Sequence, residues 1–138
     1  MVAMRLACTA VLNPLTMTES TTIPMVRLTI AITSIVAGGV LDGIANANLL
    51  YVGVATGNLF VRKGSESTLV RCEKQFPEPI IDIVIDPTNG LTVYVATQHF
   101  VFRSDNGGDS WTDLTLSTFG IVQEFSSLAL VKLPFTTD

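Results

Sequence analysis

Residues 80–114 read IIDIVIDPTNGLTVYVATQHFVFRSDNGGDSWTDL, and they contain four short runs rich in Val, Ile, Tyr, Phe and Thr. These residue types favour a pleated, half-buried surface. Turn residues separate the runs, and Asn89-Gly90 and Asn106-Gly107 allow positive φ at little cost. The pattern therefore predicts four short antiparallel strands, over Ile80–Ile85, Thr92–Thr97, Phe100–Ser104 and Ser110–Leu114.

The same pattern occurs once before in the chain. The run around Tyr51 matches the run around Tyr94, and the two tyrosines lie 43 residues apart. Arg62 and Arg103 each end the next run and lie 41 residues apart, so we place them at equivalent repeat positions. No segment after Pro24 has a sustained helical period, so the predicted fold class is all-β. The first set of four strands is expected over Ile32–Ala37, Leu49–Val54, Leu59–Lys63 and Thr68–Glu73.

Four antiparallel strands in a repeat of about 40–50 residues are typical of one blade of a β-propeller. We therefore predict that residues 26–138 form an incomplete β-propeller of four-stranded antiparallel blades. One blade is expected at about 30–75, a second at about 78–116, and the first strand of a further blade at about 124–133. A β-sandwich of seven to nine strands also fits a chain of 138 residues, but a sandwich requires no internal repeat.

The composition excludes several classes of protein. Apolar residues make up 48% of the chain and charged residues only 14%, which excludes intrinsic disorder. The net charge of −4 gives no support to a nucleic-acid partner. The longest uncharged apolar stretch, Leu28–Leu41, is shorter than the roughly 20 residues that a membrane-spanning helix needs. No membrane span is therefore expected.

Residues 1–25 are expected to be an irregular N-terminal segment. Their apolar part, Leu6–Leu12, is at the lower length limit for a signal peptide, and a remnant of a longer chain is the alternative. The sequence leaves the location open and favours an extracellular or cell-surface one. The cysteines Cys8 and Cys72 lack the spacing of a disulfide framework or a metal site, so we expect two unpaired thiols.

The most specific motif lies in the last predicted turn of the second repeat. Residues 104–111 read SDNGGDSW. This stretch resembles the Asp box, also called the bacterial neuraminidase repeat, of sialidase-type β-propellers. The resemblance covers the second repeat fully and the first only loosely, since Lys63-Gly64-Ser65-Glu66-Ser67 stands at the corresponding turn and no Trp follows. The residues that match the box are Ser104, Asn106, Gly108, Ser110 and Trp111.

The resemblance implies a structural role for this motif rather than a ligand site. Glycines permit a tight turn with positive φ, and Asn106 is expected to bind backbone amides in that turn. Trp111 is expected to insert between strands as a buried core residue. A calcium loop built on Asp105, Gly107 and Asp109 is a poor fit, because the glycine and glutamate that an EF-hand-like count requires are absent. We therefore expect no metal site.

A catalytic sialidase would need an arginine cluster, a tyrosine nucleophile and an acidic partner. Because Arg62 and Arg103 are placed at equivalent positions, we interpret them as solvated strand ends. Tyr51 and Tyr94 recur in register, which is first of all a packing pattern. The arginines of the chain are Arg5, Arg27, Arg62, Arg71 and Arg103.

Other glycosidases use two carboxylates, and four acidic residues of this chain are candidates: Asp42, Asp82, Asp86 and Glu124. No spacing selects a pair among them. Asp82 is the candidate functional residue, because it interrupts an apolar strand and could face a central channel. His99 has no Cys or Asp at ligand spacing, so we interpret it as an ordinary turn or surface histidine.

The sequence therefore predicts a non-catalytic β-propeller repeat module for scaffolding or for ligand or protein binding, within a larger protein. The alternative is a truncated, sialidase-like glycoside hydrolase that lacks its catalytic residues. We expect no catalytic residue and no cofactor. Because propellers close with four to eight blades, the expected partners are the missing blades of a parent chain or further copies of this chain. A glycan or a protein is the candidate ligand.

Overall fold

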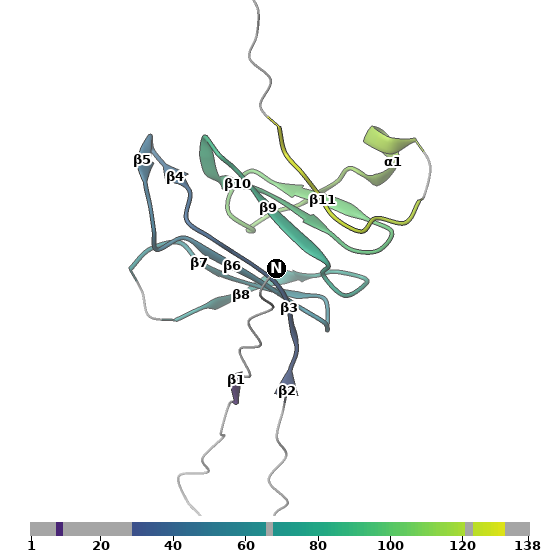
Figure 1. Cartoon of the computed structure of the whole chain (residues 1–138), viewed down its shortest axis with the longest axis horizontal. Coiled ribbons are helices and arrows are strands. Elements are labelled where there is room, and N and C mark those ends of the chain that lie inside the picture. The colour runs from purple at the N-terminus through teal and green to yellow at the C-terminus, as the bar shows by residue number, and fades with distance from the viewer. Residues whose placement is uncertain (1–7, 10–28, 66–67, 121–122, 132–138) are drawn as a thin grey trace, which may run out of the picture.

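The computed structural model describes residues 8–9, 29–65, 68–120 and 123–131. Two four-stranded antiparallel sheets, one above the other in Figure 1, make up most of this part of the chain. In each sheet the strands lie side by side in the order in which they occur along the chain. The predicted all-β class is confirmed.

The strands lie where alternating apolar residues and turn residues predict them. The eight expected strands are all present, although their ends shift by up to three residues. The first sheet contains β3 (Ile32–Ala37), β6 (Leu50–Val54), β7 (Asn58–Arg62) and β8 (Val70–Gln75), in that order. The second contains β9 (Asp82–Asp86), β10 (Asn89–Ala96), β11 (Val101–Ser104) and β12 (Thr112–Asp113), also in chain order.

Several smaller elements lie outside the predicted pattern. A hairpin of β4 (Val40–Leu41) and β5 (Ile44–Ala45) follows β3, and its turn holds Asp42 and Gly43 at positive φ, as tight hairpin turns require. A single helical turn, α1 (Thr115–Phe119), follows β12. Within the segment expected to be irregular, β1 (Cys8–Thr9) pairs with β2 (Thr29–Ile30). The rest of residues 1–25 lies outside the described residues.

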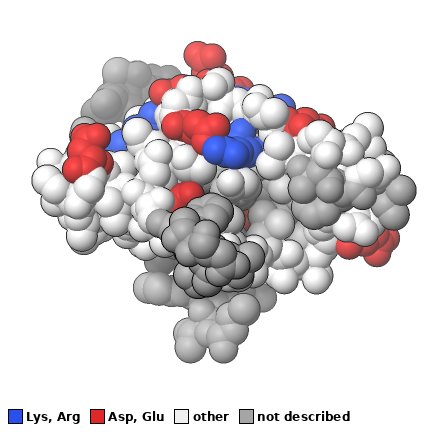
Figure 2. All heavy atoms as spheres, turned by 90° about the horizontal axis from the view of Figure 1, so that it is seen from above, with Lys and Arg blue, Asp and Glu red and all other residues white. Residues whose placement is uncertain are grey.

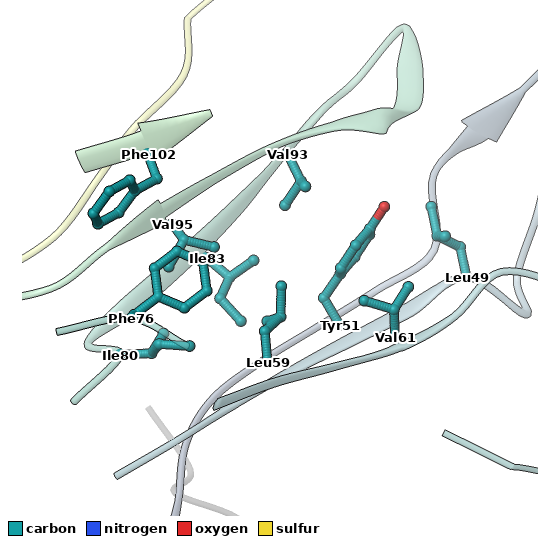
Figure 3. Close-up of a cluster of buried hydrophobic side chains, with 10 residues drawn as sticks. All are labelled: Leu49, Tyr51, Leu59, Val61, Phe76, Ile80, Ile83, Val93, Val95 and Phe102. Atoms are coloured by element: carbon teal, nitrogen blue, oxygen red, sulfur yellow. The ribbon is translucent and has the colours of Figure 1, made fainter. Parts of the chain in front are cut away.

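The core lies between the two sheets, as Figure 3 shows. Because successive side chains of a strand point to opposite faces of the sheet, every second residue of β6, β7, β9 and β10 points into this core. The linker between the sheets contributes two further side chains. The cluster consists of Leu49, Tyr51, Leu59, Val61, Phe76, Ile80, Ile83, Val93, Val95 and Phe102.

Two residues of β6 determine how closely the sheets approach. The buried Tyr51 hydroxyl donates a hydrogen bond of 2.9 Å to the Gly90 carbonyl oxygen of the second sheet, which satisfies a polar group inside the core. Gly53 also faces the second sheet. A Cβ there would lie 2.5 Å from Ile80 Cγ2, so only glycine leaves room for Ile80.

A segment at the C-terminal end covers the face of the second sheet that points away from the first. The Leu128 N–H donates to Asp82 Oδ2 at 2.7 Å, and the Phe125 N–H donates to the Gln98 carbonyl oxygen at 2.7 Å. In Figure 1 this segment crosses over the second sheet. Its described part, residues 123–131, pairs into no sheet. The strand expected at about 124–133 does not form within residues 123–131, which Asp82 of β9 instead holds by one hydrogen bond from the Leu128 N–H.

The surface carries both signs of charge. Figure 2 shows acidic and basic side chains interspersed on one face of the molecule, without a continuous basic patch on that face. Among the described residues, no helix has the length and apolar character needed to cross a membrane.

Candidate functional site

The turn between β11 and β12, residues 104–111, is held together by its own polar side chains. The Ser104 hydroxyl donates to Asn106 Oδ1 at 2.9 Å. Asn106 then uses both ends of its amide on Ser110: Oδ1 accepts the Ser110 N–H at 2.9 Å, and Nδ2 donates to Ser110 Oγ at 2.8 Å. Each of the three polar residues of the predicted box is therefore part of one local network. We call residues 104–111 the Ser104–Trp111 turn.

Two glycines allow this turn to close. Gly107 and Gly108 have φ values of +71° and +98°, which a residue with a Cβ adopts only with strain. The Gly108 N–H donates to Ser104 Oγ at 2.8 Å, and the Gly107 N–H donates to the Leu91 carbonyl oxygen at 2.8 Å. The turn is thus tied both to its own first residue and to β10.

Trp111 is half-buried, whereas a fully buried core residue was expected. Its ring meets Phe76 edge to face, with centroids 5.1 Å apart, and its indole N–H donates to the Gly108 carbonyl oxygen at 3.0 Å. The difference has a simple cause. Trp111 lies at the open edge of the two sheets, where the ring caps the core at Phe76 instead of entering it.

A cleft with a volume of about 620 Å³ lies between the Ser104–Trp111 turn and the first sheet. Lys63, at the end of β7, reaches across it: Nζ donates to Asp109 Oδ1 at 2.9 Å and to the Asn106 carbonyl oxygen at 3.2 Å. Arg71 and Glu73 line the same cleft from β8. The walls therefore combine both signs of charge with apolar side chains such as Val61 and Val70.

The same cleft contains a cysteine that is a poor nucleophile. Burial raises the pKa of the Cys72 thiol to about 11, a rise that Lys63 opposes and Asp109 assists. A thiol with this pKa is almost wholly protonated at neutral pH, and the thiolate is the reactive form. Cys72 has no disulfide partner among the described residues, while Cys8 is described only for its backbone.

Lys63 and Gly64 begin the turn of the first repeat that corresponds to the Ser104–Trp111 turn. Residues 66–67 of that turn lie outside the described residues. In the described part of this turn, Lys63 forms an ion pair with Asp109 and donates a hydrogen bond to the Asn106 carbonyl oxygen, both in the Ser104–Trp111 turn. The first repeat thus contributes a cation to the turn of the second repeat.

Asp82, the predicted candidate residue, is half-buried on β9, and its carboxylate accepts hydrogen bonds from two backbone N–H groups. Oδ1 accepts the Ile83 N–H at 2.9 Å, and Oδ2 accepts the Leu128 N–H at 2.7 Å. Both carboxylate oxygens are therefore engaged by backbone amides. Asp82 anchors residues 123–131 to β9.

The other carboxylates considered from the sequence have separate positions. Asp86 accepts hydrogen bonds from the Thr88 N–H and hydroxyl, both at 2.7 Å, and Asp42 lies in the β4–β5 turn. Asp82 and Asp86 lie four residues apart on one strand, which places their Cα atoms about 13 Å apart at about 3.3 Å per residue. Glycosidase pairs lie roughly 5–9.5 Å apart, so these two do not form one.

The structure assigns the arginines and tyrosines to different surroundings. Arg62 Nε donates to the Asn48 carbonyl oxygen at 3.0 Å, and Arg103 Nε donates to Asp105 Oδ1 at 2.9 Å. Tyr51 is buried between the sheets, whereas Tyr94 lies on the opposite face of the second sheet, under the Arg103 guanidinium at 5.7 Å. Arg5 and Arg27 lie outside the described residues.

The strand pairing corrects one part of the repeat alignment. Tyr51 pairs with Val61, but Tyr94 pairs with Arg103. When the two tyrosines are superposed, Arg103 therefore corresponds to Val61 and not to Arg62. The hairpin between β6 and β7 differs in length from that between β10 and β11, which shifts the register by one residue.

His99 lies in the β10–β11 turn, as expected, but it has carboxylate partners that the sequence did not indicate. Its Nδ1 lies 2.6 Å from Glu78 Oε1, and its Nε2 lies 3.9 Å from Glu124 Oε1. The His99 N–H also donates to Glu78 Oε2 at 2.9 Å. Glu78 comes from the linker between the sheets, 21 residues away in sequence, so no local pattern could indicate it.

Glu78 should make folding dependent on pH. Burial raises the pKa of Glu78, but hydrogen bonds from His99 and Thr97 outweigh this effect and hold the pKa below its ordinary value. A lowered carboxyl pKa stabilises the fold above its ordinary value, about 4.3, and the gain is lost as the pH falls through the lowered value. We expect Glu78→Gln to cost about 0.5–1 kcal/mol at neutral pH and almost nothing below that window.

Urea unfolding across pH 3–8 measures this difference. Glu73→Gln, which removes one exposed carboxylate of β8, is the control for the loss of a single acidic charge. A Glu78→Gln effect of the same size at every pH would contradict the assignment.

The charged residues of the Ser104–Trp111 turn do not converge on a metal. Asp105 is bound by Arg103 and Thr92, and Asp109 by Lys63. The described residues contain no group of three or more His, Cys, Asp or Glu side chains that could hold a metal ion. Comparison with family models, with curated proteins and with solved structures finds no match to this chain.

Proposed function

We propose that this chain is a non-catalytic repeat module built from β-propeller-type blades of the Asp-box class, and that it serves as a scaffold or binding platform within a larger assembly. The observation that carries the proposal is the direction in which the two sheets stack. A glycan or a protein remains the candidate ligand, and the cleft of about 620 Å³ beside the Ser104–Trp111 turn is the place proposed for it.

The stacking is head to tail. Tyr51 of the first sheet points at the second sheet and binds Gly90. The equivalent Tyr94 points away from the first sheet and lines a small cavity with Leu128 and Leu130. In a sandwich with twofold symmetry, equivalent residues would both face the shared core. A rotation that repeats from sheet to sheet, as in a propeller, explains why they do not.

The Ser104–Trp111 turn supports the same assignment. Its five box residues are joined by hydrogen bonds within the turn, from Ser104 through Asn106 to Ser110 and from Trp111 to Gly108. The carboxylates that a hydrolase would need are engaged elsewhere, with Asp82 held by two backbone amides. This arrangement favours the scaffold over the truncated glycoside hydrolase.

The two tyrosines provide the test of the stacking, because the chain contains only two. After selective tyrosine labelling, nuclear Overhauser contacts of the Tyr51 ring should lead to the second sheet, to Val93 and Gly90. Contacts of the Tyr94 ring should lead to Leu128 and Leu130. Contacts from both rings into one shared core would indicate a twofold sandwich and would overturn the proposal.

A panel of fluorogenic glycosides, including sialosides, tests the absence of catalysis. We expect no release above the buffer rate. Hydrolysis that disappears in Asp82→Asn but persists in the control Asp42→Asn, which removes a carboxylate of the β4–β5 turn, would overturn the non-catalytic assignment.

A further inference from the structure

Two exposed apolar residues lie at the start of β8, beside the cleft of about 620 Å³. Leu69 is 41% exposed and Val70 is 67% exposed, and Val70 lines the cleft together with Val61 and Cys72. Val61 and Val70 lie directly opposite each other on β7 and β8, so their side chains share one face of the sheet. Adjacent exposed apolar residues that line a hollow are a common feature of interaction sites.

This apolar wall offers almost no hydrogen-bonding groups to a ligand. The two valine side chains have none, and the thiol of Cys72 is only a weak donor. Sugar hydroxyl groups placed there would lose their hydrogen bonds to water, whereas an aliphatic side chain gains by leaving water. The wall therefore favours an aliphatic side chain of a peptide over a sugar ring.

Arg71 adds a positive charge beside this wall. Its side chain is exposed, it lines the cleft, and its guanidinium has no hydrogen bond or ion pair among the described residues. Lys63, by contrast, is paired with Asp109 at 2.9 Å. Three of the five Lys and Arg residues in the described ranges line this cleft, in a chain whose net charge is −4. The cleft therefore has room for an anionic group at Arg71.

The carboxylates of the cleft limit how much negative charge a ligand can carry. Asp109 is paired with Lys63. Glu73 is exposed and lies two residues after Arg71 on β8, so the two side chains point to the same side of the strand. Because like charges placed side by side are costly, Glu73 opposes a run of acidic residues. The charges favour one carboxylate, placed next to Arg71.

We propose that this edge of the cleft binds a segment of another protein in which an aliphatic side chain stands next to a single carboxylate. The aliphatic side chain packs on Val61 and Val70. The carboxylate pairs with Arg71, because a planar guanidinium binds a carboxylate through two N–H groups at once. This inference rests on the proposed function, since it names the ligand of the same cleft.

Titration of the isotope-labelled full chain with the peptide acetyl-Ser-Leu-Asp-Gly-Ser-amide, followed by the amide resonances, tests this ligand. The resonances of Val61, Val70 and Arg71 should shift. Replacing the leucine of the peptide with serine, or its aspartate with lysine, should weaken the response. A chain that gives no shift at any concentration of the Leu-Asp peptide overturns the proposal, as does an equal response to all three peptides.

Arg71→Gln tests the charged contact. It should weaken binding of the Leu-Asp peptide about two- to fivefold, as expected for an exposed ion pair. Arg103→Gln is the matched control, because it removes an arginine of β11 that does not line the cleft, and it should leave binding unchanged. Arg71→Glu should make the Leu-Lys peptide the better ligand. Equal losses in the two glutamine variants would mean unspecific attraction to positive charge and would overturn the proposal.

Val70→Ser tests the apolar contact in the same way. It should weaken binding about threefold or more, whereas Ile44→Ser, at a 71% exposed isoleucine of the β4–β5 hairpin, should not. Equal losses in these two variants contradict the packing on Val70.

Sialyllactose is the competing probe. If it shifts the resonances of Val61, Val70 and Arg71 and the peptides do not, the ligand is a glycan and this inference is wrong, while the binding module of the proposed function stands. The tyrosine contacts described above test the stacking without any ligand, so failure of the peptide and failure of the proposed function are separate results.

Discussion

Replacing Gly57 with alanine should lower the free energy of unfolding by about 2–5 kcal/mol. Gly57 lies in the β6–β7 turn at φ +80°, where a Cβ brings strain of about 1–2 kcal/mol. The added Cβ would also lie 2.5 Å from the Phe76 carbonyl oxygen and 3.0 Å from that of Glu78. These are backbone atoms of the linker between the sheets, so relief would require the linker to move.

The linker cannot move without breaking other contacts. The Phe76 N–H donates to the Gly57 carbonyl oxygen at 2.8 Å, and the Phe76 ring is buried between the sheets. The steric part of the loss is therefore of the size seen when a core is overfilled, about 1–3 kcal/mol.

Gly43→Ala separates strain from collision. Gly43 has φ +76° in the β4–β5 turn, and a Cβ there meets nothing within 4 Å. Its loss should be about 1 kcal/mol, and the difference between the two variants is the collision with the linker. Urea unfolding followed by circular dichroism measures both. Equal losses would show that the turn does not touch the linker.

The strands could be predicted from the sequence because their signals are local. Runs such as Leu50–Val54 and Val101–Ser104 combine β-branched or aromatic residues with flanking turn residues, and each run carries its own pattern. The pairing was less accessible. Arg103 corresponds to Val61 and not to Arg62, because the two hairpins differ in length by one residue. Since Arg62 and Arg103 each follow a tyrosine at a similar distance, the sequence favoured the wrong alignment.

In the candidate site, too, local contacts could be predicted from the sequence and long-range contacts could not. The hydrogen bonds made within the Ser104–Trp111 turn join residues at most four positions apart, so a motif of eight residues indicates them. Lys63 meets Asp109 from 46 positions away, and Leu128 meets Asp82 at the same separation. Contacts of that range follow from how the sheets stack, and neither residue carries a local sign of its partner.

The half-burial of Trp111 could not be predicted either, because it depends on a contact with a residue far away in the sequence. The motif places a tryptophan after the turn, but how deeply the ring is covered depends on Phe76, which comes from the linker. Phe76 meets both Phe102 and Trp111 edge to face, with centroids 5.1 Å away in each case. Trp111 is therefore the outermost of three rings that close one end of the core.

Trp111→Ala should lower the free energy of unfolding by about 3 kcal/mol, at the lower end of the range for a tryptophan in a core. The loss has two parts. The indole covers Phe76 at 5.1 Å, which gives apolar burial and an aromatic pair worth about 0.5–1.5 kcal/mol. Its N–H also donates to the Gly108 carbonyl oxygen at 3.0 Å, worth about 1 kcal/mol.

Trp111→Phe is the matched control, because it keeps a ring over Phe76 and removes the N–H donor. It should cost about 1–2 kcal/mol, clearly less than alanine. Far-ultraviolet circular dichroism is the right probe of urea unfolding, since Trp111 is the sole tryptophan and both variants lose its fluorescence. A loss below about 1 kcal/mol for alanine would mean that the ring does not cap the core. In that case the Ser104–Trp111 turn would be held by its hydrogen bonds alone.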